Sequence, residues 1–262
     1  EIFARHYDCS LNSPSVPRFA RCGESACRWR LTGISGLFLS IMIEFVAATR
    51  LSPAEFAASP LGVSLSRVEK DPRIKPKITY GNSAGLAGIY NRRIDSPDPA
   101  EILVFIHDDV WIEDFYVSDR IVEALKLFDV VGLAGNRRRS PGQRYWGGAI
   151  DQGQVDRHLA GAVAHGDAPL GKVAFFGPIV AEVELLDGVL LAARKSVLLG
   201  AGVRFDERFD FHFYDLDFCR TARANGLRLG TFPLAVTHRS AGGFGSPAWQ
   251  ANAERYLEKW GD

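Results

Sequence analysis

Residues 101–110 read EILVFIHDDV, and this stretch decides how the surrounding sequence is interpreted. The five apolar residues from Ile102 to Ile106 have the composition of a strand that is buried on both faces. A buried strand cannot keep carboxylates in its interior, so Asp108 and Asp109 are expected to emerge at its carboxyl end. Open α/β sheets bind ligands beyond the carboxyl ends of their strands, and we therefore expect both aspartates at the rim of an active site.

Two neighbouring carboxylates in a partly dry crevice repel each other, and a divalent cation relieves that repulsion. Oxygen ligands favour Mg²⁺ or Mn²⁺, and both ions bridge diphosphates well. A structural role is also compatible with these residues, because Asp109 can cap a turn that leads to Glu113. The pair alone therefore leaves metal binding and capping open.

The chain after Met42 alternates strand-like and helix-like segments. Strands are expected over residues 41–47, 102–106, 130–134, 185–193, 229–233 and 235–238, and helices over 53–58, 83–92, 114–128, 195–199, 213–225 and 248–260. Loops are expected over residues 70–77, which contain two prolines, and over the Gly-rich residues 137–172. The alternation predicts an α/β fold with a central, mostly parallel sheet flanked by helices.

The overall composition is that of an ordinary globular protein. The 262 residues suit one α/β domain, and 47% hydrophobic with 24% charged residues is typical of folded chains. Lys plus Arg and Asp plus Glu both number 31, so the chain lacks the basic excess of proteins that bind nucleic-acid phosphates. We therefore expect no nucleic-acid partner.

The four cysteines do not form a disulfide scaffold in a chain of this length. Cys9, Cys22 and Cys27 lie near the start, and Cys219 lies alone near the other end. No downstream Cys/His pair has the spacing of a zinc finger, so reduced thiols are expected, with a structural zinc site as the alternative.

Residues 1–41 differ from the rest of the sequence. They are rich in Arg, Ser, Pro and Cys, and they show no sustained period of 2 or 3.6 residues. The only methionine is Met42, at the start of a plausible first strand. We therefore expect residues 1–41 to be a non-native or poorly ordered extension, followed by one domain over residues 42–262.

A signal or membrane anchor is the alternative for this segment. Arg28 and Arg30 precede an apolar run over residues 36–48, which is the order of features in a signal sequence. Glu44 interrupts the run, which is also shorter than the roughly 20 residues that span a bilayer. No membrane span is therefore expected, although the surface of a membrane remains a possible place of attachment.

A second acidic cluster lies in residues 211–226, FHFYDLDFCRTARANG. Asp215 and Asp217 fall near the predicted start of a helix, where the helix dipole favours anions and an N-cap role is possible. A carboxylate held there can instead take a proton from an incoming hydroxyl group. His238 ends the predicted strand AVTH before a Gly-rich segment, so it is either a structural histidine or a metal ligand.

Taken together, these segments resemble the GT-A glycosyltransferases, in particular the family 2-like enzymes of bacteria. The similarity extends from Met42 to the C-terminus and rests on five segments in the same order and spacing. They are NSAGLAGIYN (82–91), FIHDDV (105–110), DGVLLAARKSVL (187–198), RFDERFDFHFYDLDFCRTARANGLRL (204–229) and VTHRSAGG (236–243). The resemblance implies a Rossmann-like GT-A fold in one domain.

The resemblance also implies a metal site for Mn²⁺ or Mg²⁺. The Asp-x-Asp motif of the family falls on His107, Asp108 and Asp109, so Asp109 becomes the ligand of the ion that grips the diphosphate. His107 departs from the aspartate that the family usually has at this position. His238 matches the strand-end histidine that completes the metal site in many GT-A enzymes.

The catalytic acids follow from the same resemblance. The Glu-Asp motif of the family falls on Tyr214 and Asp215, so the first position again departs from the pattern. Asp215 is then the general base that deprotonates the acceptor, and Asp217 is a supporting acid.

The remaining implied residues bind the nucleotide sugar. Ala48 and Thr49 end the first strand where such enzymes hold the nucleotide, and Asp187 and Gly188 resemble the segment that lines the sugar and acceptor side. The full set implied for the nucleotide sugar is Ala48, Thr49, Asn82, His107, Asp108, Asp187 and Gly188. Trp146 and Trp249 can stack on a sugar or serve only as packing.

The implied function is a metal-dependent inverting glycosyltransferase that moves a sugar from a nucleotide-sugar donor to a hydroxyl group. Its partners would be the donor and a carbohydrate or glycoconjugate acceptor, in a bacterial, cytoplasmic setting such as polysaccharide assembly. A nucleotidyltransferase would carry a basic Gly-rich loop after its first strand, which RLSPAEF is not. The alternative is a catalytically inactive protein of the same fold that binds nucleotide sugars or carbohydrates, since His107 and Tyr214 depart from the family pattern.

Overall fold

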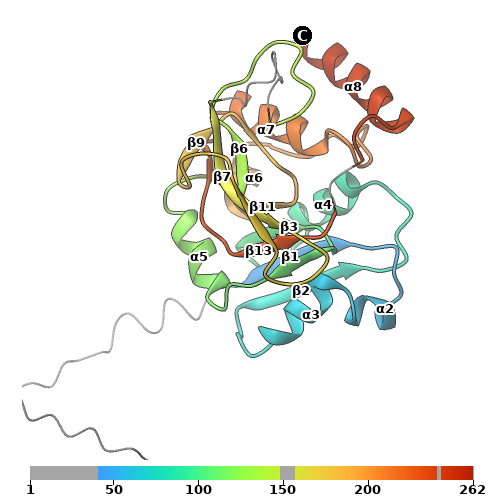
Figure 1. Cartoon of the computed structure of the whole chain (residues 1–262), viewed down its shortest axis with the longest axis vertical. Coiled ribbons are helices and arrows are strands. Elements are labelled where there is room, and N and C mark those ends of the chain that lie inside the picture. Colours follow the sequence, from blue (N-terminus) through green and yellow to red (C-terminus); the bar gives the residue numbers. More distant parts are fainter. Residues whose placement is uncertain (1–40, 148–156, 241–242, 262) are drawn as a thin grey trace, which may run out of the picture.

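The computed structural model of the chain describes residues 41–147, 157–240 and 243–261 (Figure 1). The first 40 residues lie outside this part, and so does nearly all of the extension predicted over residues 1–41. The strands are β1 (Ile43–Ala48), β2 (Ile74–Thr79), β3 (Ile102–Ile106), β4 (Val110–Ile112), β5 (Val130–Gly132), β6 (Ala134–Asn136), β7 (Leu159–His165), β8 (Lys172–Phe175), β9 (Ala181–Val183), β10 (Leu185–Leu186), β11 (Leu190–Arg194), β12 (Leu229–Thr231) and β13 (Val236–His238). The helices are α2 (Pro53–Ala57), α3 (Pro60–Arg67), α4 (Leu86–Ile94), α5 (Val117–Ala124), α6 (Lys195–Gly200), α7 (Tyr214–Ala224) and α8 (Pro247–Trp260).

The main sheet has the strand order β2-β1-β3-β11-β5-β12-β9. The strands β2, β1, β3, β5 and β12 point in one direction, and β11 and β9 point in the opposite direction. The predicted α/β class with a mostly parallel central sheet is therefore confirmed. The two reversed strands were not predicted.

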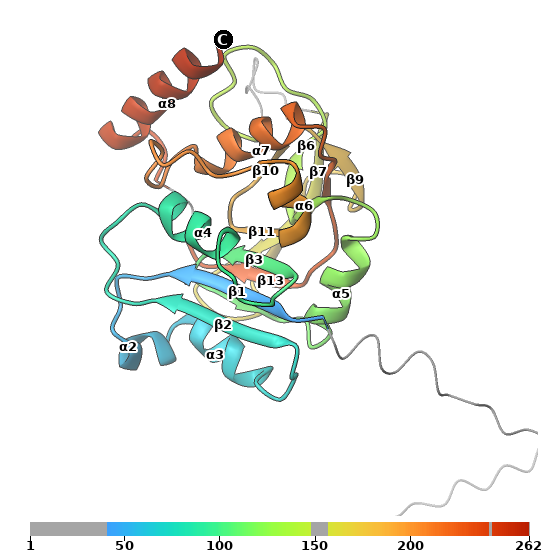
Figure 2. The same ribbon diagram turned by 180° about the vertical axis from the view of Figure 1, so that it is seen from behind.

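Helices cover both faces of this sheet, as the apolar strands require (Figure 2). Side chains alternate along β3, so Leu103 and Phe105 pack on the side of α4, α6 and α7. Ile102, Val104 and Ile106 pack on the side of α2, α3 and α5. All five residues of β3 are buried, which is why the strand consists only of apolar residues.

A second sheet, in the order β10-β6-β7-β13-β4 with β8 paired to β7, lies against the main one. The strand β4 begins directly after residues 107–109, which follow β3. The tripeptide His107-Asp108-Asp109 therefore joins the two sheets, and this junction places the candidate site.

Two predicted loops contain strands. Residues 70–77 were predicted as a loop, but Ile74–Thr79 pairs in parallel with β1 as an edge strand. Pro76 is tolerated there because an edge strand needs backbone hydrogen bonds on one side only. The predicted loop 137–172 contains β7 and the first residue of β8, while residues 148–156 lie outside the described part.

Several predicted elements also have different bounds. The helix predicted over residues 114–128 spans only Val117–Ala124, and Phe115 outside it is 71% exposed. The helix predicted over residues 83–92 begins at Leu86, and Gly85 rather than Asn82 or Ser83 is its N-cap. The strand predicted over residues 185–193 is two strands, β10 and β11. Among the described residues, no helix is long and apolar enough to cross a membrane.

Candidate active site

The site is built where β3 of the main sheet passes into β4 of the second sheet. The backbone amide of His107 donates to the carbonyl of Val189 at 3.1 Å, which ties the junction to the segment before β11. His238 pairs with Val110 across the antiparallel strands β13 and β4. The amide of Arg239 donates to the carbonyl of Asp109 at 3.0 Å, so His238 is held next to Asp109.

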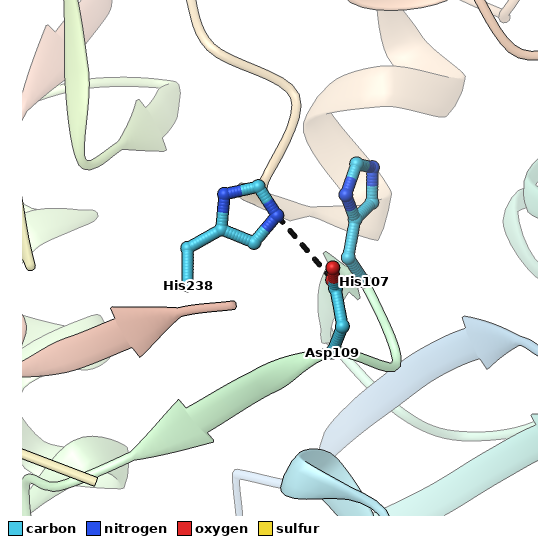
Figure 3. A group of neighbouring side chains, drawn as sticks. All are labelled: His107, Asp109 and His238. Carbon is cyan, nitrogen blue, oxygen red and sulfur yellow. Dashed lines mark ion pairs between the residues drawn. The ribbon is translucent and has the colours of Figure 1, made fainter. Parts of the chain in front are cut away.

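Three side chains converge at this junction, from His107, Asp109 and His238 (Figure 3). Each offers one possible metal-ligating atom, and these atoms all lie within 4.8 Å of one another. The Nε2 atom of His238 lies 3.3 Å from Oδ1 of Asp109 and 3.2 Å from Oγ of Ser240. His238 is buried, whereas His107 and Asp109 are half-buried.

The electrostatics of the cluster keep Asp109 and His107 in ligating form. Burial raises the pKa of Asp109, but its contacts with His238, Ser240 and His107 lower it by more than burial raises it. The pKa of Asp109 is therefore below its ordinary value. Burial, with a further contribution from His238, lowers the pKa of His107 to about 4. Asp109 is therefore a carboxylate and His107 a neutral imidazole near pH 7, which are the forms that bind metal ions.

The donor set fits a divalent transition-metal ion. One carboxylate and two imidazoles leave further coordination positions open for a substrate, and imidazole favours transition metals over Mg²⁺. The predicted ligands Asp109 and His238 are brought together, and His107 joins them. The prediction placed His107 with the nucleotide sugar, because the resemblance offered only an aspartate for that position.

The main cavity, of about 400 Å³, lies beside this cluster and contains Asp215 in its wall. Asp215 stands in the first turn of α7, and its Oδ2 accepts a hydrogen bond from the amide of Gly188 at 3.1 Å. Phe213, which precedes the helix, adopts a left-handed φ of 67° and packs its ring 5.3 Å from those of Trp249 and Tyr256. Strain of this kind is held in place by surrounding packing and is common at functional sites.

Burial, and then the charge of Asp187, raises the pKa of Asp215 to about 7. Burial raises the pKa of Asp187 as well. Asp187 and Gly188 lie in the break between β10 and β11, and both line the cavity. The carboxyl group of Asp215 can therefore exchange a proton near neutral pH, which suits a general base.

Asp217 lies elsewhere. Its side chain is fully buried, and its Oδ1 lies 2.7 Å from Nζ of Lys259 and accepts a hydrogen bond from Nε1 of Trp260 at 2.8 Å. It does not line the cavity. The structure therefore does not bring Asp217 together with Asp215 and instead places it between α7 and α8.

Only some of the residues predicted to hold the nucleotide lie beside the cluster. Ala48 and Asp108 line a smaller hollow of about 100 Å³ that also reaches His107 and Asp109. Thr49 is buried and its Oγ1 accepts from the amide of Leu51 at 3.1 Å, while Asn82 bonds to the backbone of Ala84. Thr49 and Asn82 line neither of these two hollows.

Aromatic side chains form much of the lining of this cavity. Trp146 and Trp249, for which sugar stacking and packing were both open, line the cavity. Further lining rings belong to Tyr145, Phe176, Phe211, Phe213 and Phe244. These were missed because they come from separate loops, and only the local sequences RYWGG and FGSPAW signalled aromatic residues beside glycines.

Two solved structures match this chain at low identity. S. aureus TarS 1-349 in complex with UDP is 14% identical with a TM-score of 0.49, and the match covers 83% of this chain and 64% of that one. GalNAc-T7 with UDP, GalNAc and Mn²⁺ is 10% identical with a TM-score of 0.49, and the match covers 83% of this chain and 48% of that one. The chain spans less than two thirds of the length of either.

The sequence comparisons place the chain in a family. No curated protein matches it significantly. A family model described as a glycosyltransferase-like family matches residues 76–239, which is more than half of the chain and includes His107, Asp109, His238, Asp187 and Asp215. The chain belongs to this glycosyltransferase-like family.

Proposed function

We propose that the protein is a metal-dependent inverting glycosyltransferase that moves a sugar from a nucleotide-sugar donor to a hydroxyl group of a carbohydrate or glycoconjugate. One observation carries this proposal. A single cavity contains a candidate base with a pKa of about 7, Asp215, and adjoins a cluster of three metal-ligating side chains. Glycosyl transfer requires both a proton acceptor and stabilisation of a departing diphosphate.

Asp215 is the proposed general base. Its carboxyl group is held by the Gly188 amide and is partly ionised near neutral pH, so it can accept the proton of an acceptor hydroxyl. That hydroxyl then forms a bond to the anomeric carbon as the bond to the diphosphate oxygen breaks on the opposite side. The acceptor loses its proton to Asp215, and the nucleoside diphosphate leaves with the bonding electron pair.

His107, Asp109 and His238 are the proposed ligands of the divalent ion. When bound, such an ion neutralises the negative charge that develops on the diphosphate. Mn²⁺ is the proposed ion, because two imidazoles in the donor set favour a transition metal over Mg²⁺. The small hollow beside Ala48 and Asp108 adjoins this cluster and is the proposed place of the nucleoside.

The part of the main cavity lined by Trp146 and Trp249 is the proposed acceptor side. Sugar rings stack their apolar faces on aromatic side chains, and Trp249 and Trp146 both line the cavity that contains Asp215. Arg144 also lines this cavity and is exposed, so its guanidinium group can meet an anionic group of the acceptor or donor.

A screen of nucleotide sugars with Mn²⁺ tests the proposed function. Thermal shift measures binding, and release of the nucleoside diphosphate measures turnover, with matched samples in EDTA and in Mg²⁺. At least one nucleotide is expected to raise the melting temperature only when Mn²⁺ is present. The absence of metal-dependent stabilisation by every nucleotide tested would reject the proposal.

The same screen separates the enzyme from an inactive binding protein of the same fold. An inactive protein would be stabilised by a nucleotide sugar and Mn²⁺ but would neither hydrolyse the donor nor transfer its sugar. An active enzyme is expected to hydrolyse its donor slowly without an acceptor and faster when a suitable acceptor is added.

A further inference from the structure

The two positions that depart from the family pattern, His107 and Tyr214, are hydrogen-bonded to each other. Nε2 of His107 lies 2.9 Å from the hydroxyl oxygen of Tyr214, although the residues are 107 positions apart in the chain. The Tyr214 hydroxyl also donates to the carbonyl of Gly188 at 2.8 Å. The two departures therefore form one connected unit.

This arrangement fixes which nitrogen of His107 carries the proton. A carbonyl oxygen only accepts hydrogen bonds, so the single hydroxyl proton of Tyr214 is directed to Gly188. The Tyr90 hydroxyl, which is also hydrogen-bonded to Tyr214, can donate to one lone pair of the hydroxyl oxygen, and Nε2 of His107 donates to the other. His107 is therefore held as the tautomer with its proton on Nε2 and a free lone pair on Nδ1.

The free lone pair faces the metal cluster. One ring nitrogen of His107 is turned toward His238 and Asp109, and the other points away from them (Figure 3). Since Nε2 contacts Tyr214, the nitrogen on the side of the cluster is Nδ1. A ligating imidazole needs a lone pair on the side of the ion and a partner for its other N–H group.

The cavity wall is shaped to hold Tyr214 in this position. A Cβ atom at residue 188 would lie 2.5 Å from the Tyr214 hydroxyl and 2.8 Å from Cβ of Asp215, so glycine permits the close approach. Tyr214 is buried, and its ring packs 5.9 Å from that of Tyr90 and 6.0 Å from that of Phe205. The hydroxyl therefore has little freedom to leave His107.

We propose that Tyr214 is a positioning residue that holds the His107 proton on Nε2 and so presents Nδ1 to the metal ion as a third protein ligand. This inference rests on the proposed metal site and deepens it. It explains the two departures together: histidine replaces the first aspartate of the Asp-x-Asp motif, and tyrosine replaces the glutamate of the Glu-Asp motif to orient it. The resulting site of two imidazoles and one carboxylate selects Mn²⁺ over Mg²⁺.

The test measures Mn²⁺ binding and the His107 tautomer in the full chain. Tyr214→Phe removes only the hydroxyl group, and we expect it to weaken Mn²⁺ binding by about 10- to 100-fold, as for other partners of metal ligands. His107→Ala is expected to weaken binding at least as much, and the double variant no more than His107→Ala alone. Titration calorimetry with Mn²⁺ alone gives these affinities without requiring turnover.

Two further measurements separate positioning from general support of the fold. Nitrogen-15 NMR of metal-free protein is expected to show His107 protonated on Nε2 in the wild type and a mixture of tautomers in Tyr214→Phe. Pulsed EPR of bound Mn²⁺ is expected to detect two coupled imidazole nitrogens in the wild type and one in His107→Ala. Tyr256→Phe is the matched control, because it removes a buried hydroxyl that contacts Arg220 rather than His107.

The outcomes distinguish this inference from the proposed function. Wild-type protein that binds no Mn²⁺ would reject the metal site and, with it, the ligand role of His107. Mn²⁺ affinity that is equal in the wild type and Tyr214→Phe would overturn the role of Tyr214 and leave the metal site standing. An Nδ1-protonated His107 in the wild type would overturn it as well.

Discussion

The chain carries two close pairs of aspartates, one at the end of β3 and one in the first turn of α7, and the fold separates the members of each pair. At the end of β3, Asp109 joins the histidine cluster, whereas Asp108 lines only the smaller hollow beside it. In α7, Asp215 faces the main cavity, whereas Asp217 is buried against Lys259. In both regions, proximity in sequence does not make the two acids equivalent.

The geometric reasons differ between the two regions. Asp108 and Asp109 lie in the turn between β3 and β4, which brings Asp109 to the histidine cluster and leaves Asp108 outside it, although both line the smaller hollow. Residues two apart on a helix are separated by about 200° around its axis, so Asp217 must face away from the cavity when Asp215 faces into it. The strand-end pair can therefore share one site, whereas the helix pair cannot.

The largest expected effect tests the helix pair through catalysis. Asp215→Asn keeps the size of the side chain but removes the proton acceptor, so kcat for transfer is expected to fall by about 10²- to 10⁴-fold. Nucleotide binding in the presence of Mn²⁺ should change little, because the metal cluster remains intact. Steady-state transfer assays and calorimetry measure the two quantities, and undiminished transfer would reject Asp215 as the base.

The next effect tests the strand-end pair through metal affinity. Asp109→Asn removes the only carboxylate of the cluster, and Mn²⁺ affinity is expected to fall by on the order of 100-fold. Asp108→Asn is the matched control at the adjacent position, with Mn²⁺ affinity expected to stay within about twofold because Asp108 lies outside the cluster. Titration calorimetry measures both Mn²⁺ affinities, and an equal loss of affinity in the two variants would mean that both acids ligate the ion.

The third effect tests whether Asp217 in α7 contributes to stability rather than to transfer. Asp217→Asn removes the buried partner of Lys259, so the free energy of unfolding is expected to fall by about 2 kcal/mol. The loss stays below that of a fully orphaned buried charge because Lys259 also lies 2.8 Å from Asp206. Urea unfolding of the full chain measures it, and transfer by the folded variant should remain within a few-fold of wild type.

An opposite result for Asp217→Asn would be informative in its own right. A variant that unfolds like the wild type but loses transfer would restore Asp217 as a supporting acid, the role that the family resemblance implies. Lys259→Met gives a second view of the same pair, because it removes the cation and leaves the carboxylate in place.

The fold was predictable where local pattern and burial agree. The run Ile102–Ile106 has the length and composition of a buried strand, and the α/β alternation followed from the segments around it. The edge strand Ile74–Thr79 escaped prediction because its side chains are mostly exposed or half-buried and Pro76 interrupts the run. Its pairing with β1 is a tertiary contact that local propensity does not reveal.

The site was predictable only in part for the same reason. Asp109, His238 and Asp215 stand at element ends with a recognisable motif, and the fold brings them to one place. The partners that define their chemistry come from distant parts of the chain: Tyr214 for His107, and Lys259 for Asp217. Hydrogen bonds of this kind depend on packing between elements, and no periodicity in the sequence encodes them.

The smallest effect concerns the pH dependence that Asp187 gives to Asp215. Burial and the negative charge of Asp187 raise the pKa of Asp215 to about 7. Protonated Asp215 cannot accept a proton, so kcat/KM should rise with pH through a midpoint near pH 7 and level off at higher pH. Asp187→Asn removes the like charge, which makes ionisation of Asp215 easier and should move this rise to lower pH by about one unit or less.

The pH at the midpoint of the rise in kcat/KM, rather than the maximum value of kcat/KM, reports the coupling between Asp187 and Asp215. Asp187 lines the cavity, so its replacement can lower the rate at every pH without informing on the coupling. A change of height alone, with the midpoint unmoved, would mean that burial sets the pKa of Asp215 without help from Asp187. A shift to higher pH would contradict the sign of the interaction and would require another group as the base, since removing a negative neighbour cannot raise the pKa of a carboxyl group.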